Sequence, residues 1–259
     1  MKALVLSAGR GERLMPLTAT VPKPLVEVGG RPLIHYPLKL LAHAGVREIA
    51  INVHHLAASV QSALGSGDAL SVRITYAPEE TLLGTGGPLV GLRDFIGGET
   101  FAILNCDTVI GLDLRALAEF HRRTGALATM VLRESATPEA YSQIQIDAAS
   151  RVRRMRLLKS RRPPEFADYG STLDSANSAP LKAYMYCGVM LCEPAVFGMM
   201  PPIAPPFSLM GDLFAPLLAR GAVIFGQLHR GWFRTVDDLK SLEALRAEFA
   251  RRPPHLPFL

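Results

Sequence analysis

The sequence has few cysteines, few aromatic side chains and no long apolar run. Its three cysteines, Cys106, Cys187 and Cys192, are too few and too unevenly spaced for a disulfide framework or a zinc cluster, so we expect a reducing compartment, the cytoplasm. No stretch approaches the roughly 18 consecutive apolar residues of a membrane-spanning helix, and the N-terminal residues lack a signal-peptide pattern. We therefore expect no membrane insertion.

An even spread of charge is also absent. The 28 basic and 23 acidic residues give a net charge of +5, but residues 151–162 alone hold seven basic residues and no acid, so the rest of the chain sits near −2. This basic run has no interleaved aromatic side chains on which nucleic-acid bases could stack. We therefore expect no nucleic-acid partner, and the simplest interpretation of the run is a solvated basic face.

What the sequence does contain is enough apolar material for a core, with 49% hydrophobic and 20% charged residues. Short apolar runs at residues 3–6, 48–53 and 100–105 are typical of strands buried on both faces. Helical patterns at 33–44 and 88–95 lie before the second and third runs. This alternation predicts an α/β fold, a Rossmann-like, mostly parallel sheet with helices on both faces.

The pattern changes in the second half. A helix at 114–123 and a strand at 126–133 are followed by alternating segments at 143–147 and 152–158, which predict half-exposed antiparallel strands. Residues 160–180 are rich in serine, proline and charge without periodicity, and we expect a loop or lid there. A further strand is expected at 182–192, and helices at 214–219 and 239–249. We expect one domain over 1–259, with functional halves at about 1–135 and 136–250.

The densest chemical signal follows the first strand. Gly9 and Gly11 allow backbone amides to approach a phosphate, and the cations Arg13 and Lys23 lie close by in the sequence. Leu14 replaces the third glycine of a dinucleotide-binding loop, and no Gly-Lys-Ser/Thr follows. Two cations beside a glycine turn suit a nucleoside triphosphate that loses pyrophosphate. The alternative is an ordinary strand-to-helix turn.

A carboxylate stands at the end of another strand. Asn105-Cys106-Asp107 terminates the run at 100–105, which places Asp107 at the carboxyl edge of the sheet. Magnesium usually takes one or two carboxylates together with phosphate oxygens and water, so a second acid is expected far away in the sequence. Asp237 and Asp238 stand before the helix that begins at residue 239, and either could simply cap it.

These segments resemble the sugar-1-phosphate nucleotidyltransferases from residue 1 to about 248. The resemblance implies that the first loop binds the triphosphate, that Arg13 stabilises the departing pyrophosphate and that Lys23 contacts phosphate. Glu12 stands where these enzymes usually have threonine. The aromatic segment at 231–239 resembles the stretch whose acid completes a Mg²⁺ site with Asp107, with Asp237 as the best match.

Other candidate residues also come from the resemblance. The loop at 83–88 is similar to one that lines the nucleobase pocket, although it could be an ordinary turn before a helix at Pro88. Gly188 matches a glycine that leaves room for the sugar, and Lys159 matches a lysine that binds the sugar phosphate, with Arg156 or Arg161 as alternatives. The substrate-binding candidates are Leu6, Ala8, Gly9, Gly11, Glu79, Gly84, Thr85, Gly86, Asn105, Lys159 and Gly188.

The activity implied by the resemblance is Mg²⁺-dependent transfer of a nucleotidyl group from an NTP to a sugar 1-phosphate. Similarity favours guanylyl transfer to a mannose- or heptose-type phosphate, with cytidylyl, uridylyl or thymidylyl transfer as alternatives. A competing hypothesis is a non-catalytic subunit that senses nucleotide or sugar. The expected partners are the two substrates, and a homodimer is one option for the oligomeric state, which the sequence leaves open.

Overall fold

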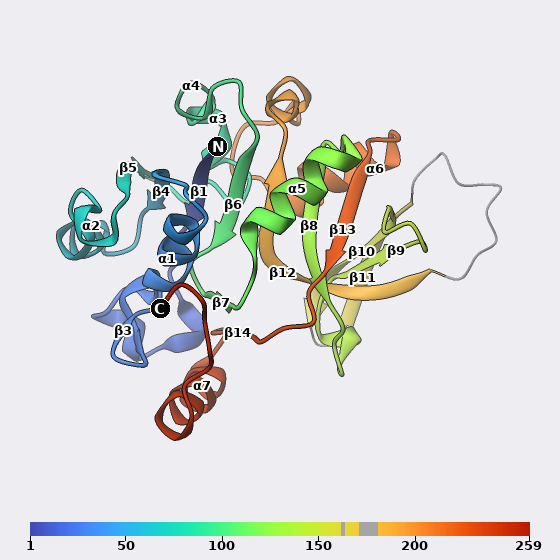
Figure 1. Cartoon of the computed structure of the whole chain (residues 1–259). Helices are drawn as coiled ribbons and strands as arrows, with labels where there is room; N and C mark the ends of the chain where they lie inside the picture. Colours follow the sequence, from blue (N-terminus) through green and yellow to red (C-terminus); the bar gives the residue numbers. More distant parts are fainter. Residues whose placement is uncertain (162–163, 171–180) are drawn as a thin grey trace.

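The computed structural model describes residues 1–161, 164–170 and 181–259 and is built around a ten-stranded sheet (Figure 1). Its strands lie in the order β11-β10-β9-β12-β6-β1-β4-β5, with β8 paired to β12 and β13 paired to β8. One part of the sheet is parallel. Its strands are β1 (Lys2–Leu6), β4 (Glu48–Val53), β5 (Arg73–Pro78) and β6 (Phe101–Asn105).

The other part of the sheet is mostly antiparallel. Its strands are β8 (Ala128–Arg133), β9 (Gln143–Ile146), β10 (Val152–Arg161), β11 (Pro164–Gly170), β12 (Lys182–Cys192) and β13 (Ile224–Leu228). β12 joins the two parts because it pairs with β6 as well as with β8 and β9. The sheet also curls back on itself, since the amide of Gly226 in β13 donates to the carbonyl of Ser150 at 2.8 Å.

Two short ribbons and several helices complete the fold. The ribbons are β2 (Glu27–Val28) with β3 (Arg31–Pro32), and β7 (Thr108–Ile110) with β14 (Phe233–Thr235). The α-helices are α1 (His35–His43), α2 (Ala57–Leu64), α3 (Pro88–Gly91), α4 (Arg93–Ile96), α5 (Leu114–Thr124), α6 (Ala215–Ala219) and α7 (Leu239–Arg251). Short 3-10 helices span Glu12–Leu14, Leu17–Ala19, Lys23–Leu25, Asp68–Leu70, Pro138–Ala140 and Pro194–Met199, and a π-helix spans Leu209–Phe214.

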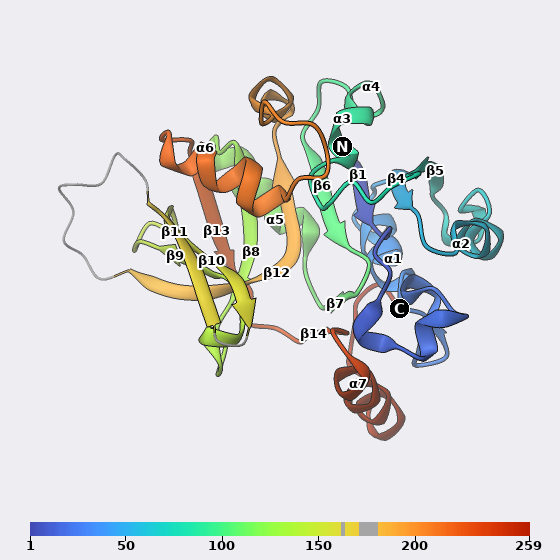
Figure 2. The same cartoon turned by 180° about the vertical axis from the view of Figure 1, so that it is seen from behind.

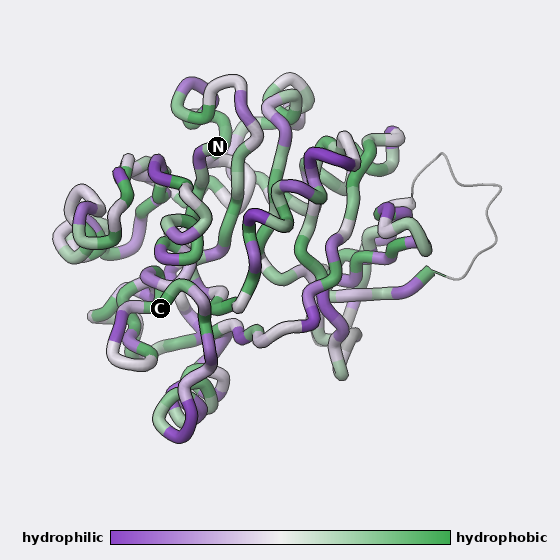
Figure 3. The backbone as a smooth tube through the Cα atoms, in the orientation of Figure 1, coloured by the Kyte–Doolittle hydropathy of each residue, from purple (hydrophilic) through white to green (hydrophobic). Residues whose placement is uncertain are grey.

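Helices cover both faces of the sheet, as the apolar runs predicted (Figures 1 and 2). Successive residues of β1 point to opposite faces, so Val5 belongs to one core cluster with α1, α5 and α7, and Leu4 belongs to another with α3, α4 and α6. The middles of the central strands are accordingly hydrophobic (Figure 3), while polar residues such as Lys2, Asn52 and Asn105 stand at or near the strand ends. No helix in the described part of the chain is long and apolar enough to cross a membrane.

Several sequence predictions need correction. The strands β5, β13, β7 and β14 were missed, and the helix expected at 88–95 is two single turns, α3 and α4. The loop or lid expected at 160–180 was wrong for 160–161, which end β10, and for 164–170, which form β11 and pair with β10. Residues 164–170 are ordered as a strand because β10 and β11 form a hairpin with contacts between their side chains. The Arg156 guanidinium lies 4.3 Å from the centre of the Phe166 ring. Residues 162–163 and 171–180 lie outside the described part of the chain.

A buried polar network fixes α5 against the sheet. His121 of α5 contacts the Thr129 hydroxyl of β8 through Nδ1 at 2.7 Å and Glu193 Oε1 through Nε2 at 3.0 Å. The hydroxyl of Thr100, just before β6, donates to the same Glu193 oxygen at 2.6 Å. Burial lowers the pKa of His121 and outweighs the nearby carboxylate of Glu193, which acts to raise it.

This network predicts that acidification destabilises the fold. Because the pKa of His121 is lower in the folded state, the unfolded chain binds more protons, and stability is lost as the pH falls below the ordinary histidine value of about 6.5. His35 and His229 also have lowered pKa values and act in the same direction. We expect the free energy of unfolding in urea to fall between pH 7 and pH 5.5, and to fall less in His121→Gln. Equal pH slopes for the two proteins would contradict this assignment.

Candidate functional site

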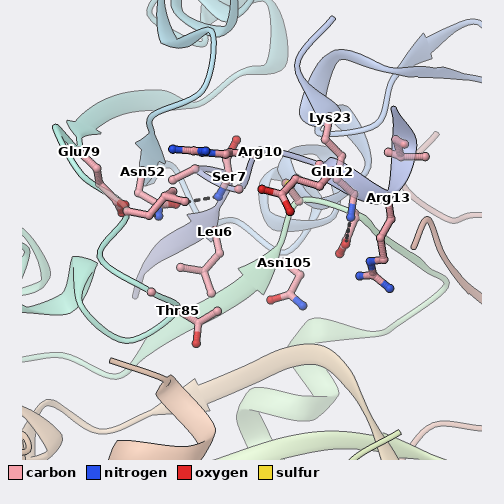
Figure 4. Close-up of a pocket in the computed structure, with 18 of the residues that line it drawn as sticks. Leu6, Ser7, Arg10, Glu12, Arg13, Lys23, Asn52, Glu79, Thr85 and Asn105 are labelled. Carbon is pink, nitrogen blue, oxygen red and sulfur yellow. Dashed lines mark hydrogen bonds and ion pairs between the residues drawn. The ribbon is translucent and has the colours of Figure 1, made fainter. Parts of the chain in front are cut away.

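The carboxyl ends of the parallel strands surround a cavity of about 660 Å³ (Figure 4). This is the edge at which ligands bind in open α/β sheets. It brings together most of the candidates from distant parts of the sequence. Those that line it are Leu6, Ala8, Gly9, Gly11, Arg13, Lys23, Glu79, Gly84, Thr85, Asn105, Asp107 and Asp237. Gly86 and Gly188 do not line this cavity, although both lie close to residues that do.

The first loop is shaped by Gly11. Its φ of +66° lies in the left-handed region, and a Cβ there would come within 2.9 Å of the Thr18 methyl group and 3.2 Å of the Lys23 Cβ. The Gly11 carbonyl accepts hydrogen bonds from the Thr18 hydroxyl at 2.9 Å and the Leu14 amide at 2.8 Å. This turn starts the 3-10 helix Glu12–Leu14, from which the Arg13 side chain reaches Asp237 (Figure 4).

Two cation–carboxylate pairs stand in the cavity. Lys23 Nζ is paired with Asp107 Oδ2, and these side chains are only 13% and 17% exposed. Arg13 Nη2 lies 3.0 Å from Asp237 Oδ1, in a more exposed position. Burial acts to lower the pKa of Lys23, but the negative charges around it, Asp107 foremost, outweigh burial and raise the pKa above its usual value. Lys23 is therefore a fixed positive charge at neutral pH.

The two acids meet because β7 pairs with β14. Thr108 lies opposite Thr235 in this antiparallel ribbon, and the Val236 amide donates to the Asp107 carbonyl at 3.2 Å. Asp107 and Asp237 each lie just beyond the paired residues. Neither β7 nor β14 was predicted from the sequence, so the approach of the two acids had rested on the resemblance alone.

Asp238 has a different place from Asp237. It is the N-cap of α7, where its side chain accepts from the Ser241 amide at 2.8 Å and the Ser241 hydroxyl contacts the amides of both aspartates at 2.9 Å. The hydrogen bonds from Ser241 hold the pKa of Asp238 below its usual value. The sequence suggested two roles for these neighbouring acids, helix cap and metal ligand. Asp238 caps the helix, while Asp237 lines the cavity.

Sequence reasoning missed Asn52, which connects three strand ends. Its Oδ1 accepts from the Ser7 amide at 2.7 Å, and its Nδ2 donates to Glu79 Oε1 at 2.7 Å. Glu79 Oε2 in turn accepts from the Leu83 amide at 2.9 Å. Asn52 and Glu79 are both buried and both line the cavity (Figure 4). An asparagine near the end of an otherwise apolar strand was the available signal.

The second loop needs its glycines for packing. Gly84 has a φ of +76°, and a Cβ there would lie 2.4 Å from the Phe207 carbonyl oxygen. At Gly86 a Cβ would lie 2.5 Å from the Phe207 ring. The Gly86 amide donates to the Phe207 carbonyl at 3.0 Å, and the Thr85 hydroxyl accepts from the Leu209 amide at 2.9 Å. The segment around Phe207 thereby fixes this wall of the cavity.

Gly188 lies behind the cavity wall. Its φ is +73°, and a Cβ there would lie 2.9 Å from Asn105 Nδ2 and 2.7 Å from the Thr108 hydroxyl. Glycine at this point therefore allows β12 to approach the end of β6. Lys159 belongs to β10, but its side chain lies outside the described part of the structure, as does that of Arg161.

The charge of the basic run is partly compensated where the structure describes its side chains. Arg153 lies 2.6 Å from Asp147, and both side chains are mostly buried. Arg154 and Arg156 approach the two oxygens of Asp168 at 3.1 and 3.8 Å. These pairs neutralise part of the charge that the sequence concentrates there.

The cysteines are unsuited to nucleophilic catalysis. Burial, chiefly, raises the pKa of Cys106 to about 12 and that of Cys187 to about 12, and it also raises the pKa of Cys192. All three are buried free thiols. A thiol is reactive as the thiolate, which is scarce at neutral pH when the pKa is this high.

The donor set is compatible with magnesium. Asp107 Oδ1 is buried and has no hydrogen-bonding partner among the residues that the structure describes, while Oδ2 is paired with Lys23. An orphaned carboxylate oxygen at this depth fits a cation ligand. Among the described residues no group of three or more histidine, cysteine, aspartate or glutamate side chains could hold a metal. Asp107 and Asp237 therefore fit Mg²⁺ best when a substrate supplies further oxygens.

The sequence is similar to those of several known proteins. The family profile described as nucleotidyl transferase matches residues 2–156. N-acetylmuramate alpha-1-phosphate uridylyltransferase from Neisseria meningitidis is 44% identical over 117 residues, which are 45% of this chain and 51% of the relative. Mannose-1-phosphate guanylyltransferase from Mycobacterium tuberculosis is 34% identical over 150 residues, 58% of this chain and 42% of the relative.

The chain spans about half the length of the curated relatives it matches. The fold is shared over the whole chain with a Bacillus anthracis protein described as a glucose-1-phosphate thymidylyltransferase, with a TM-score of 0.81, 23% identity, and coverage of 100% of this chain and 98% of the other. The Rossmann-like fold predicted from the sequence is thereby confirmed. Because the family profile matches more than half of this chain, the chain belongs to the nucleotidyl transferase family.

Proposed function

We propose that this protein transfers a nucleotidyl group from an NTP to a sugar 1-phosphate, giving an NDP-sugar and pyrophosphate. The observation that carries the proposal is the pair of cation–carboxylate contacts, Lys23 with Asp107 and Arg13 with Asp237, in one cavity at the carboxyl edge of the sheet. Family membership supports the same reaction class. A purely sensory subunit has no need for both acids and both cations.

The chemistry requires no general base. The phosphate of a sugar 1-phosphate is already ionised at neutral pH, so one of its oxygens can attack the α-phosphorus in line while pyrophosphate leaves. The loop containing Gly9 and Gly11 would hold the triphosphate through backbone amides, and Arg13 and Lys23 would compensate its charge as pyrophosphate departs. Mg²⁺ held by Asp107 and Asp237 would screen the phosphate oxygens.

We further propose a division of labour within one domain, residues 1–259. The part up to about residue 135 would bind the nucleotide, with Glu79 and the loop containing Gly84, Thr85 and Gly86 beside the base. The part from 136 to 250 would bind the sugar phosphate, with Gly188 shaping the boundary and Lys159 or a neighbouring arginine contacting the phosphate. Asn105 lies where the two parts meet, because β6 pairs with β12.

For the base and sugar we favour guanylyl transfer to a mannose- or heptose-type phosphate. The Mycobacterium tuberculosis guanylyltransferase supports this choice over more than half of the chain. Each Glu79 oxygen already accepts one hydrogen bond, from Asn52 Nδ2 or from the Leu83 amide, and keeps one further lone pair that would suit a donor group on the Watson–Crick edge of guanine. Uridylyl transfer is the second candidate, because the Neisseria relative is 44% identical over its aligned part.

Replacing Arg13 tests the triphosphate assignment. We expect Arg13→Ala to lower kcat/KM by about 100-fold or more, because an oriented cation that stabilises a departing anion contributes several kcal/mol in the transition state. Its free energy of unfolding should change by less than about 0.5 kcal/mol, since the side chain is mostly exposed. Pyrophosphate release is the measurement, and Arg252→Ala removes an exposed arginine beyond α7 as the control. An unchanged kcat/KM in Arg13→Ala would show that Arg13 does not act in the reaction.

The three aspartates should separate in a Mg²⁺ titration. Asp107→Asn and Asp237→Asn should each lower pyrophosphate release on the order of 100-fold and raise the Mg²⁺ requirement, because each removes a carboxylate from the metal. The double variant should be scarcely worse than the poorer single one if the acids act as a unit. Asp238→Ala should instead cost about 0.5–2 kcal/mol of stability and retain transfer. Full activity of Asp237→Asn at limiting Mg²⁺ would defeat the two-carboxylate site.

Substrate choice is tested by a panel of four NTPs against mannose, heptose, glucose and N-acetylmuramate 1-phosphates. We expect the highest kcat/KM with GTP and a mannose- or heptose-type phosphate. Glu79→Gln should narrow the preference for GTP over UTP, because the amide replaces one acceptor oxygen by a donor. Faster turnover with UTP would reverse the base assignment. Nucleotide binding without pyrophosphate release from any pair would favour the sensory alternative.

A further inference from the structure

A second cavity, of about 380 Å³, lies at the carboxyl ends of β8 and β13. In Figure 1 these two strands run side by side, and the chain continues from β13 toward β14. Among the described residues, the cavity shares no lining residue with the one at the carboxyl edge of the parallel strands. Its lining residues are Arg133, Glu134, Tyr184, Leu228, His229 and Arg230.

Both arginines of this cavity lack a carboxylate partner in the described part of the chain. The Arg133 guanidinium lies 5.0 Å from the centre of the Phe233 ring and makes only long contacts, at 3.3 and 3.4 Å, with the carbonyls of Glu134 and Phe233. Arg230 is exposed and forms no ion pair with any residue that the structure describes. Two uncompensated guanidinium groups at one cavity suit an anion with several oxygens.

Tyr184 provides an independent sign of a ligand. Its side chain is 7% exposed and belongs to an apolar core cluster, yet its hydroxyl makes no hydrogen bond within residues 1–161, 164–170 and 181–259. The hydroxyl oxygen is not itself enclosed by protein atoms, so it is open to the cavity and free to bond a ligand there. His229 also lines the cavity. Burial lowers its pKa, and its Nε2 lies 3.2 Å from the Trp232 carbonyl oxygen.

We propose that this cavity is a second binding site, for a small phosphorylated sugar. Arg133 and Arg230 would hold the phosphate oxygens, the Tyr184 hydroxyl would donate to the ligand, and the Glu134 carboxylate would accept from a sugar hydroxyl. The volume exceeds the need of a bare phosphate ion and suits a phosphorylated hexose. Since no residue is shared with the first cavity, the site does not depend on the proposed transfer reaction.

Calorimetry without NTP or Mg²⁺ tests the site. The probes are glucose 6-phosphate, whose phosphate is not on C1, and inorganic phosphate. We expect glucose 6-phosphate to bind more tightly than phosphate, and Arg230→Ala to weaken its binding by about tenfold or more, as expected for loss of a charge-assisted contact. Tyr184→Phe, which keeps the ring, should weaken it a few-fold. Arg220→Ala removes an exposed arginine outside the cavity and should change the affinity less than twofold.

The Arg13→Ala variant distinguishes the two cavities, because Arg13 lines only the first. This variant should bind glucose 6-phosphate with the affinity of the unchanged protein. Loss of binding in Arg13→Ala would place the ligand in the first cavity and overturn the proposal. Equal weakening in Arg230→Ala and Arg220→Ala would show only general charge attraction, and no binding of either probe would also refute the site. Inorganic phosphate binding as tightly as glucose 6-phosphate would overturn the assignment to a sugar.

Discussion

The pairing of β7 with β14 is the constraint on which the site depends. It brings Asp107 and Asp237 together across 130 positions of sequence, and each acid then faces a cation from the N-terminal loop. Without the ribbon, Lys23 would be a largely buried charge beside one acid, and Arg13 would have no fixed partner in this edge of the sheet. Of the two pairs, only Lys23 with Asp107 is largely withdrawn from water, and there each charge needs the other as a partner, whereas the pair of Arg13 with Asp237 is more exposed.

The sheet makes this pairing possible because β12 is shared by both of its parts. β12 pairs with β6 over its C-terminal half and with β9 over its N-terminal half, so the end of β6 lies beside the antiparallel part. Gly188 permits that contact, since a side chain there would collide with Asn105. The glycines of the second loop have a comparable role beside Phe207. In both places a glycine allows two segments to pack closely, and this packing determines the shape of the cavity.

The sequence was most informative where a pattern was local. Buried strands such as 3–6 and 48–53, and the glycine turn with Arg13 and Lys23, depend on neighbouring residues and were predicted from them. The ribbon β7–β14 is only three residues long on each side, and its partners are far apart, so no local period marks it. Asn52 and the walls near Phe207 depend on contacts between distant segments. β11 was obscured by the serine- and proline-rich composition around it.

The separate roles of Asp237 and Asp238 follow from the start of α7. An N-cap residue takes an extended backbone, and Asp238 does so, with φ of −154° and ψ of 177°. Its side chain is committed to the Ser241 amide, at the beginning of the helix. Adjacent residues in extended backbone point their side chains to opposite sides, so Asp237 is directed away from the helix and toward Arg13. One acid thus fixes the helix and, through the backbone, orients the other toward the cavity.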